Sequence, residues 1–233
     1  MKALPLGLLP DTAEVRADGS LSIGGCSLLD VAATFGTPAF VYDEAHLRAR
    51  CREAVAAFGP GRAVYATKAF LCSAMARLAY EEGMLLDVAS GGEMFVALRA
   101  GVPANALTLH GSNKSLDELR MGITEGVRHI VVDSFDELDR LDALRREGLP
   151  VPNVLARITP GVHAHTHEFI ATGQDDSKFG FNLGNGDALR AVERMQKSKS
   201  VNLVGVHCHI GSNVFEASSF GRAAEVMARF AAP

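Results

Sequence analysis

The chain has 233 residues, 48% of them hydrophobic and 21% charged, which is enough for one large domain with a core or for two smaller ones. Its 23 Lys and Arg and 27 Asp and Glu residues give a net charge of −4, so composition argues against nucleic-acid binding and against disorder. No apolar run reaches the length of roughly 18 residues that predicts a membrane span, and the first ten residues do not resemble a signal peptide.

The four cysteines are Cys26, Cys51, Cys72 and Cys208, and no pair has C-x-x-C spacing. This pattern argues against a disulfide framework or a thiolate metal site. It predicts a protein of a reducing compartment, the cytoplasm.

Short apolar runs alternate with segments of helical spacing, which predicts an α/β fold of strand–helix units. The predicted strands are Ala63–Ala66, Leu85–Ala89, Leu107–His110, His129–Asp133, Val154–Thr159 and Leu203–Ile210. A last helix is predicted from Glu216 to Ala231. Helix starts carry the S-x-x-E capping-box pattern at Ser90/Glu93, Ser115/Glu118 and Ser134/Glu137.

The first strand is not followed by the G-x-G-x-x-G motif of a dinucleotide-binding sheet; the sequence there reads Tyr65–Phe70. Instead, polar residues stand at the C-terminal ends of the strands, where a TIM-type barrel keeps its chemistry. They are Lys68, Asp87, Ser90, His110, Asp133, Arg157, His207 and His209. We therefore predict a (β/α)8 TIM-type barrel. Only about six of the eight strands are found, so the sequence reads as the truncated front portion of a longer protein.

Lys68 ends an apolar strand and is either an ordinary surface lysine or a Schiff-base lysine. In the second interpretation, desolvation among Val64, Tyr65 and Phe70 would favour the neutral, nucleophilic amine. Asp87 and Arg157 interrupt apolar strands, so their burial requires partners or a ligand. The capping box with Ser90 accounts for Glu93 without any catalytic role.

His207 and His209 are two apart on a predicted strand and should face the same way. The Gly211–Ser212 turn that follows offers backbone N–H groups and a hydroxyl for an anion. The alternating histidines His163, His165 and His167 leave open a different class of enzyme, a barrel metallohydrolase.

Several motifs together resemble the fold-type III pyridoxal-phosphate decarboxylases, and within them the diaminopimelate decarboxylase family. The motifs are Tyr65–Phe70, Asp87–Glu93, His110–Ser115, Ala164–Ile170, Lys178–Phe181 and His207–Ser212. The resemblance implies pyridoxal 5′-phosphate as cofactor and conversion of meso-diaminopimelate to L-lysine and CO2. An ornithine or arginine decarboxylase is the nearest alternative, and the Ala164–Ile170 stretch argues against it.

The resemblance also implies roles for individual residues. Lys68 matches the lysine that binds the cofactor as a Schiff base, and His209 matches the histidine that stacks on the cofactor ring. Residues matched to cofactor contacts are Asp87, Arg157, Gly211 and Ser212, and the possible active-site neighbours are Glu93, His110, Asn113 and Lys178. No metal is expected.

The same resemblance divides the chain. Residues 1–35 match a segment that packs with a C-terminal β-domain, and residues 36–233 match an incomplete barrel. The β-domain and the ring-nitrogen partner match nothing in this sequence. Since the family members are homodimers with shared sites, we expect the fragment alone to be inactive or nearly so. A degenerate cofactor-binding or interaction fragment is the non-enzyme alternative.

Overall fold

The computed structural model describes residues 6–162, 179–212, 214 and 216–232. The chain forms two compact units, Met1–Val64 with Leu78–Leu85 and Tyr65–Arg77 with Leu86–Pro233. These units do not test the expected division into residues 1–35 and 36–233, because that division rests on contacts of residues 1–35 with a further domain. It stays a prediction.

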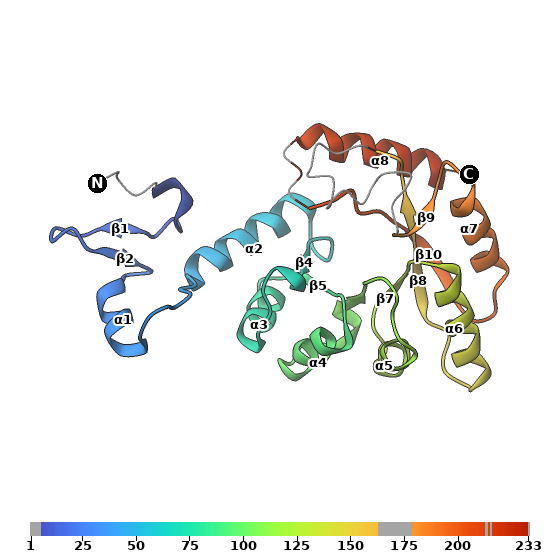
Figure 1. Ribbon diagram of the computed structural model, residues 1–233, viewed down its shortest axis with the longest axis horizontal. Helices are drawn as coiled ribbons and strands as arrows, with labels where there is room; N and C mark the ends of the chain where they lie inside the picture. The colour runs from blue at the N-terminus through green and yellow to red at the C-terminus, as the bar shows by residue number, and fades with distance from the viewer. Residues whose placement is uncertain (1–5, 163–178, 213, 215, 233) are drawn as a thin grey trace. The chain divides into compact units, whose positions relative to one another are not determined.

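The first unit contains a small antiparallel sheet and two helices (Figure 1). Its elements are η1 (Leu6–Leu8), β1 (Glu14–Val15), β2 (Leu21–Ile23), β3 (Cys26–Ser27), α1 (Leu28–Phe35) and α2 (Glu44–Phe58). The three strands pair in sequence order. Helix α2 begins at Asp43, whose carboxylate accepts a hydrogen bond from the His46 amide at 3.1 Å, the usual role of an N-cap aspartate.

The second unit is built on a sheet whose strands lie in the order β4-β5-β6-β7-β8-β10. These are β4 (Val64–Ala66), β5 (Leu85–Val88), β6 (Leu107–Leu109), β7 (His129–Val132), β8 (Asn153–Thr159) and β10 (Asn202–His207). The registered pairs from β5 to β10 are all parallel. Sequential order and parallel pairing are those of a barrel wall, whereas a doubly wound sheet reverses its strand order part-way. The predicted α/β class is confirmed.

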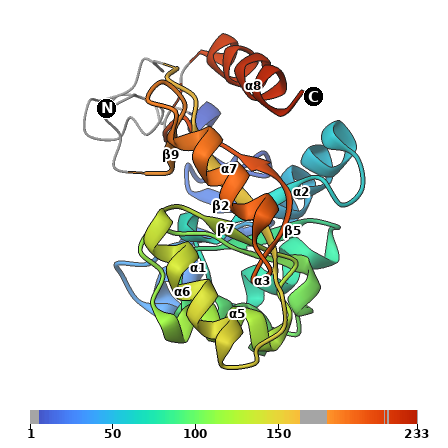
Figure 2. The same cartoon turned by 90° about the vertical axis from the view of Figure 1, so that its right-hand side faces the viewer.

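Helices connect the successive strands. They are η2 (Thr67–Ala69), α3 (Ser73–Glu81), α4 (Gly91–Arg99), η3 (Ala104–Ala106), α5 (Leu116–Glu125), α6 (Phe135–Arg146), α7 (Asp187–Lys197) and α8 (Ala217–Ala231). Helices α4 to α7 follow one another around the outside of the curved sheet in the order of the strands (Figure 1, Figure 2). The predicted starts of α4, α5 and α6 are confirmed, because each N-cap serine hydroxyl accepts the amide three residues on.

The central strands are buried on both faces, as parallel strands covered by helices must be. Fully buried side chains include Leu86, Val88, Leu107, Leu109, Ile130, Val131, Val132, Val154 and Ala156. On the two outer strands of the described sheet, Val64 and Val204 are each 46% exposed. The core of this unit therefore lies at β5 to β8, and these strands set the position of every loop at their C-terminal ends.

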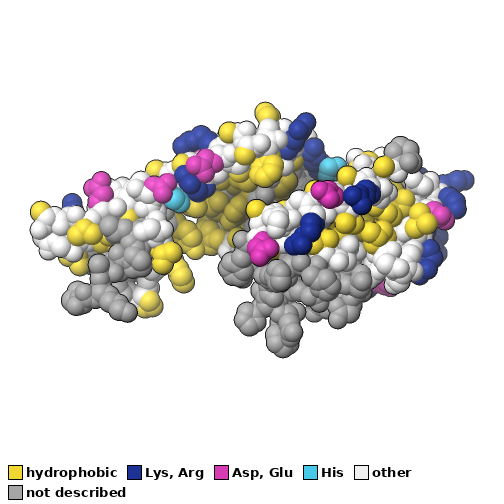
Figure 3. Space-filling model, turned by 90° about the horizontal axis from the view of Figure 1, so that it is seen from above, with side chains coloured by type: hydrophobic (Ala, Val, Ile, Leu, Met, Phe, Trp, Pro, Cys, Tyr) yellow, Lys and Arg dark blue, Asp and Glu magenta, His cyan; other side chains and the backbone are white. Residues whose placement is uncertain are grey.

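At the surface, Lys and Arg side chains are interspersed with Asp and Glu and with apolar patches on the face drawn in Figure 3. In the part of the chain that the structure describes, no helix combines the length and apolar character needed to cross a membrane.

Two sequence predictions differ from the structure at the same place. The apolar pattern predicts a last strand that runs to Ile210, but β10 ends at His207, and the pattern gives no sign of the short strand β9 (Phe181–Asn182). β10 pairs with β8 only as far as His207–Arg157, so the regular ladder stops there. The last two residues of β8 pair with β9, which is too short for an apolar pattern to indicate.

The loop after β6 depends on a glycine that approaches the neighbouring strand end closely. Gly111 has φ +91°, and a Cβ at this position would lie 2.5 Å from the carbonyl oxygen of Ala89. Glycine is required here for both its backbone conformation and its size.

We predict that Gly111→Ala lowers the free energy of unfolding by about 1–2 kcal/mol for the left-handed backbone and by a further ~1–3 kcal/mol for the steric overlap. Gly101→Ala is the matched control, since Gly101 has φ +88° and a Cβ added there would meet no atom within 4 Å. The control should show the first loss alone. Urea denaturation measures both variants. Equal losses would contradict the close approach.

Candidate active site

Polar side chains from five strands meet at the C-terminal edge of the second unit's sheet. The Nδ1 atom of His110, which follows β6, lies 3.1 Å from a carboxylate oxygen of Asp87 in β5. The His110 ring also packs edge-on against that of His207 at the end of β10, with centroids 4.6 Å apart. The predicted convergence of Asp87, His110 and His207 is therefore present.

This group has unused hydrogen-bonding capacity. Asp87 Oδ1, His110 Nε2 and His207 Nδ1 are buried, and each lacks a partner among the described residues. A buried polar atom without a partner costs about 1–3 kcal/mol, so a cluster with three such atoms calls for a further hydrogen-bonding partner, such as water or a ligand.

Arg157 lies in β8 and is 5% exposed. As predicted, its burial requires a partner: one guanidinium nitrogen lies 2.6 Å from the Asp133 carboxylate, which is equally buried. The guanidinium carbon also stands 4.8 Å from the centre of the Phe179 ring, close enough for a cation–π interaction. Arg157 is thus held on two sides at the sheet edge.

Glu93 does not complete the capping box that its spacing from Ser90 predicts. The Ser90 hydroxyl accepts from the Glu93 amide, as predicted, but the Glu93 carboxylate turns inward. It accepts a hydrogen bond from the Ala89 amide at 2.7 Å and lies 2.7 Å from the Thr67 hydroxyl. Glu93 therefore connects β5 to the residue next to Lys68, and the capping explanation is wrong for its side chain.

Lys68 lies in the 3-10 turn η2 directly after β4, and its side chain is exposed. The expectation that Val64, Tyr65 and Phe70 desolvate this amine is therefore wrong in the described structure, where Val64 itself is 46% exposed. Lys68 is still close enough to His209 for its charge to act on that imidazole.

Both histidines of the last motif are neutral at physiological pH. Burial, followed by the neighbouring His110 and Arg157, lowers the pKa of His207 to about 3. Burial and the positive charges of Lys68 and Arg157 lower the pKa of His209 to about 4. Although β10 ends before His209, the two side chains share the same charged neighbours. That they face the same way stays a prediction.

The remaining predicted residues lie in loops. Gly211 has φ +129°, and Ser212 is exposed beside it. Asn113 has φ +54°, and its side-chain oxygen accepts a hydrogen bond from Arg140. Lys178 and the histidines 163, 165 and 167 lie outside the described residues. Among the residues that are described, no group of three or more His, Cys, Asp or Glu side chains could hold a metal ion.

A buried ion pair is not apparent from the sequence. Lys114, in the loop after β6, is 2% exposed, and its ammonium lies 2.8 Å from the fully buried Glu137 of α6. The sequence pattern indicates only a helix-capping role for Glu137. Neither position lies in an apolar segment, so nothing in the local sequence indicates burial.

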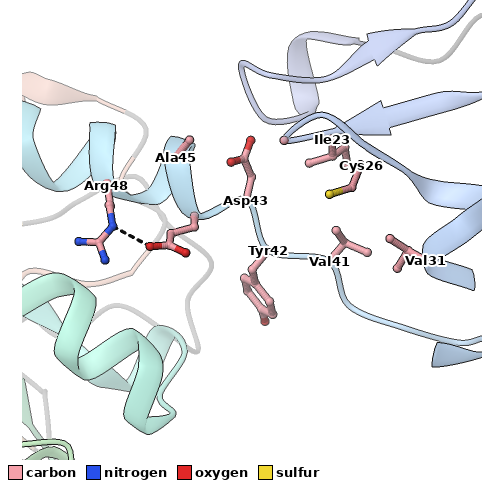
Figure 4. A pocket seen from close by; sticks show the side chains of 10 residues that line it. Ile23, Cys26, Val31, Val41, Tyr42, Asp43, Ala45 and Arg48 are labelled. Carbon is pink, nitrogen blue, oxygen red and sulfur yellow. Dashed lines mark hydrogen bonds and ion pairs between the residues drawn. The ribbon is translucent and has the colours of Figure 1, made fainter. Parts of the chain in front are cut away.

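One pocket lies next to His209, and another lies within the first unit. His209 and Cys208 line a pocket of about 270 Å³ between the end of β10 and α8. Burial raises the pKa of the Cys208 thiol, which keeps it protonated and unreactive. A pocket of about 610 Å³ lies within the first unit, where Ile23, Val31 and Val41 line it (Figure 4). Its carboxylate Asp43 already caps α2, so this pocket contains no comparable set of unpartnered polar atoms in the described part of the chain.

The family model for pyridoxal-dependent decarboxylases, described as their pyridoxal binding domain, matches residues 44–232. The chain belongs to this family. The family predicted from the sequence motifs is confirmed, and the site lies inside the matched region.

Relatives within the family are diaminopimelate decarboxylases. The enzyme of Mycobacterium tuberculosis (strain ATCC 25618 / H37Rv) is 51% identical over 207 residues, which cover 88% of this chain and 46% of that protein. The Bacillus subtilis (strain 168) enzyme is 48% identical over 221 residues, covering 93% and 50%. A crystal structure of diaminopimelate decarboxylase from M. jannaschii superposes with a TM-score of 0.86 at 34% identity, covering 96% of this chain and 53% of that one. The chain thus spans about half the length of these relatives.

The residues present fit the family's cofactor. The three unpartnered atoms of Asp87, His110 and His207 offer donors and acceptors to the heteroatoms of a polar aromatic ring. Lys68 supplies an exposed amine within electrostatic reach of His209, and Arg157 adds a fixed positive charge for an anionic oxygen.

The lowered histidine pKa values predict a pH dependence of stability. From pH ~6.5 downward the unfolded chain binds protons at these histidines while the folded chain does not, so stability falls as the pH falls towards about 4. His207→Asn should remove part of this slope. The difference in unfolding free energy between wild type and variant should be constant above pH ~7 and shift progressively in favour of the variant below it. Urea denaturation across this range measures it, and a pH-independent difference would contradict the buried neutral state.

Proposed function

We propose that this chain supplies the cofactor-binding part of a pyridoxal-phosphate-dependent decarboxylase that converts meso-diaminopimelate to L-lysine and CO2. The observation that carries the proposal is the meeting of Asp87, His110 and His207, with three unpartnered polar atoms, in a region matched by the family. The substrate is proposed from the relatives, which are named diaminopimelate decarboxylases.

In this proposal Lys68 would hold the cofactor covalently, because a primary amine condenses with an aldehyde with loss of water. Bound pyridoxal phosphate supplies the electron sink that loss of CO2 from an α-amino acid requires. His209, uncharged at neutral pH, presents a flat aromatic face for ring stacking. Gly211 and Ser212 offer a backbone amide and a hydroxyl to the phosphate.

The other charged groups orient the ring. Arg157, held by Asp133, would neutralise an anionic ring oxygen, and Asp87 with His110 forms a hydrogen-bonded pair on the same edge of the sheet. Glu93 holds Thr67 and thereby the turn that carries Lys68. Asn113 and Lys178 complete the proposed set as active-site neighbours.

The substrate proposal favours meso-diaminopimelate over ornithine or arginine. A solved M. jannaschii diaminopimelate decarboxylase is a complex with L-lysine. The Vibrio vulnificus lysine/ornithine decarboxylase is 20% identical to this chain and shares its fold. Residues 1–35 are proposed to pack with a further β-domain in the whole protein. The whole protein is proposed to be a cytoplasmic homodimer, and the free thiols of all four cysteines are consistent with a reducing compartment.

We predict that the purified chain, incubated with pyridoxal phosphate and reduced with borohydride, gains the mass of one cofactor, because Lys68 is an accessible amine beside the site. Intact-mass spectrometry measures the adduct. Lys68→Ala should abolish it. Lys197→Ala, at a lysine whose side chain is 79% exposed on α7, is the matched control and should leave it unchanged.

A folded chain that forms no adduct, or an adduct that persists in Lys68→Ala, would contradict the role of Lys68. Parallel assays with meso-diaminopimelate, ornithine and arginine then test the substrate. The chain is assayed alone and with the C-terminal half of the Bacillus subtilis relative added. Release of CO2 from ornithine or arginine in preference to meso-diaminopimelate would overturn the substrate proposal and leave the cofactor proposal intact.

A further inference from the structure

Lys114 is the largest fully buried side chain of the described structure, although it carries a charge. Its ammonium donates to the carbonyl oxygens of Gly111 and Val131, both at 2.7 Å, and pairs with Glu137 at 2.8 Å. An ammonium has three N–H donors, so all are used within the protein. Lys114 therefore has no donor left for a ligand.

Glu137 completes the connection from the other side. One of its carboxylate oxygens accepts from the Lys114 backbone amide at 3.1 Å, and the other accepts from the Asp133 amide at 2.7 Å. The pair thus fastens the loop after β6, the end of β7 and the first turn of α6 to one another. These backbone segments carry His110 and Asp133.

The connection continues to the candidate site in two directions. Asp133, whose amide Glu137 holds, pairs through its carboxylate with Arg157 at 2.6 Å. Gly111, whose carbonyl Lys114 holds, directly follows His110, and the His110 ring contacts Asp87 and His207. The hydrogen bonds and the ion pair of Lys114 and Glu137 thus reach the backbone next to both groups and involve no side-chain atom of Arg157 or His110.

Stability alone does not account for this pair. Replacing a buried ion pair by apolar residues of similar size is often neutral or stabilising, because both charges lose their hydration. Burial lowers the pKa of Lys114, and Glu137 and Asp133 oppose that shift while Arg157 adds to it. What an apolar pair lacks is the set of directed hydrogen bonds that fix the backbone at residues 111, 131 and 133.

We propose that Lys114 and Glu137 are a positioning pair, which holds Arg157 and His110 at the geometry that binds the cofactor without touching it. The inference rests on the proposed function for the identity of the ligand. Its effect on Arg157, however, is a property of the protein alone and is measured without any ligand.

The test compares variants that remove one or both charges of the pair with a control variant that lowers the stability of the fold and leaves the pair intact. Lys114→Met removes the ammonium, Glu137→Gln removes the carboxylate charge at nearly constant size, and the double variant Lys114→Met/Glu137→Met replaces both by apolar groups. Leu144→Ala is the control, because Leu144 is a fully buried core residue on the same helix α6, two turns beyond Glu137. Thermal midpoints rank their stabilities.

Affinity for pyridoxal phosphate, from a fluorescence titration, should fall about tenfold or more in Lys114→Met and Glu137→Gln. Loss of a residue that orients a metal ligand lowers metal affinity on the same scale. Leu144→Ala should bind like the wild type despite its lower midpoint. The double variant should regain thermal stability but not affinity. Unchanged affinity in both single variants, or an equal loss in Leu144→Ala, would overturn the proposal.

The second readout needs no cofactor. The guanidinium N–H signals of Arg157 in ¹⁵N NMR spectra should be protected from solvent exchange in wild type and Leu144→Ala, and should lose that protection in Lys114→Met and Glu137→Gln. Persistence of protection in both would overturn the positioning role. A wild-type chain that binds no pyridoxal phosphate would contradict the proposed function, whereas loss of Arg157 protection in the charge variants would still support the pair's effect on Arg157.

Discussion

Parallel pairing of buried strands is the constraint on which the rest of this structure depends. Because β5, β6, β7 and β8 are parallel neighbours, their C-terminal ends reach one edge together, and any polar side chain at those ends enters the same neighbourhood. The fully buried residues Leu109 and Ile130 face each other across β6 and β7, so a register slip would expose the core. The register that buries the core therefore also brings Asp87, His110 and Arg157 together.

Bringing charges to a buried edge creates a second requirement, since each buried charge needs a partner. The chain meets it with two ion pairs, Arg157 with Asp133 and Lys114 with Glu137, and the Asp133 amide links one pair to the other. What remains unpartnered among the described residues is a small set of neutral or acceptor atoms at the site itself. Contacts within the chain satisfy the charged groups of the two ion pairs. The atoms that still lack a hydrogen-bond partner lie where a ligand is proposed to bind.

The sequence predicts most of this architecture because strand–helix alternation and the N-cap serines are local signals. The sequence-based prediction fails where contacts between distant segments determine which partner a side chain or strand has. Glu93 and Glu137 fit a capping pattern that only Glu118 completes, since their carboxylates reach amides at neighbouring strand ends instead. Burial of Lys114 depends on carbonyls and a carboxylate that lie far along the chain. The early end of β10 and the short strand β9 both depend on pairing with β8, a segment distant in the sequence, which no pattern within either segment reveals.

The central claim is that these strand ends form one ligand site, and histidine imidazole NMR signals during a titration with pyridoxal phosphate test it most directly. His110, His207 and His209 are assigned to the proposed site, whereas His129 begins β7 at the opposite end of the strand and His46 lies on α2 of the first unit. The account predicts that the first three signals shift together, with one binding constant, while those of His46 and His129 stay in place. Shifts confined to one histidine, or spread equally over all five, would contradict a single site at the C-terminal edge of the sheet.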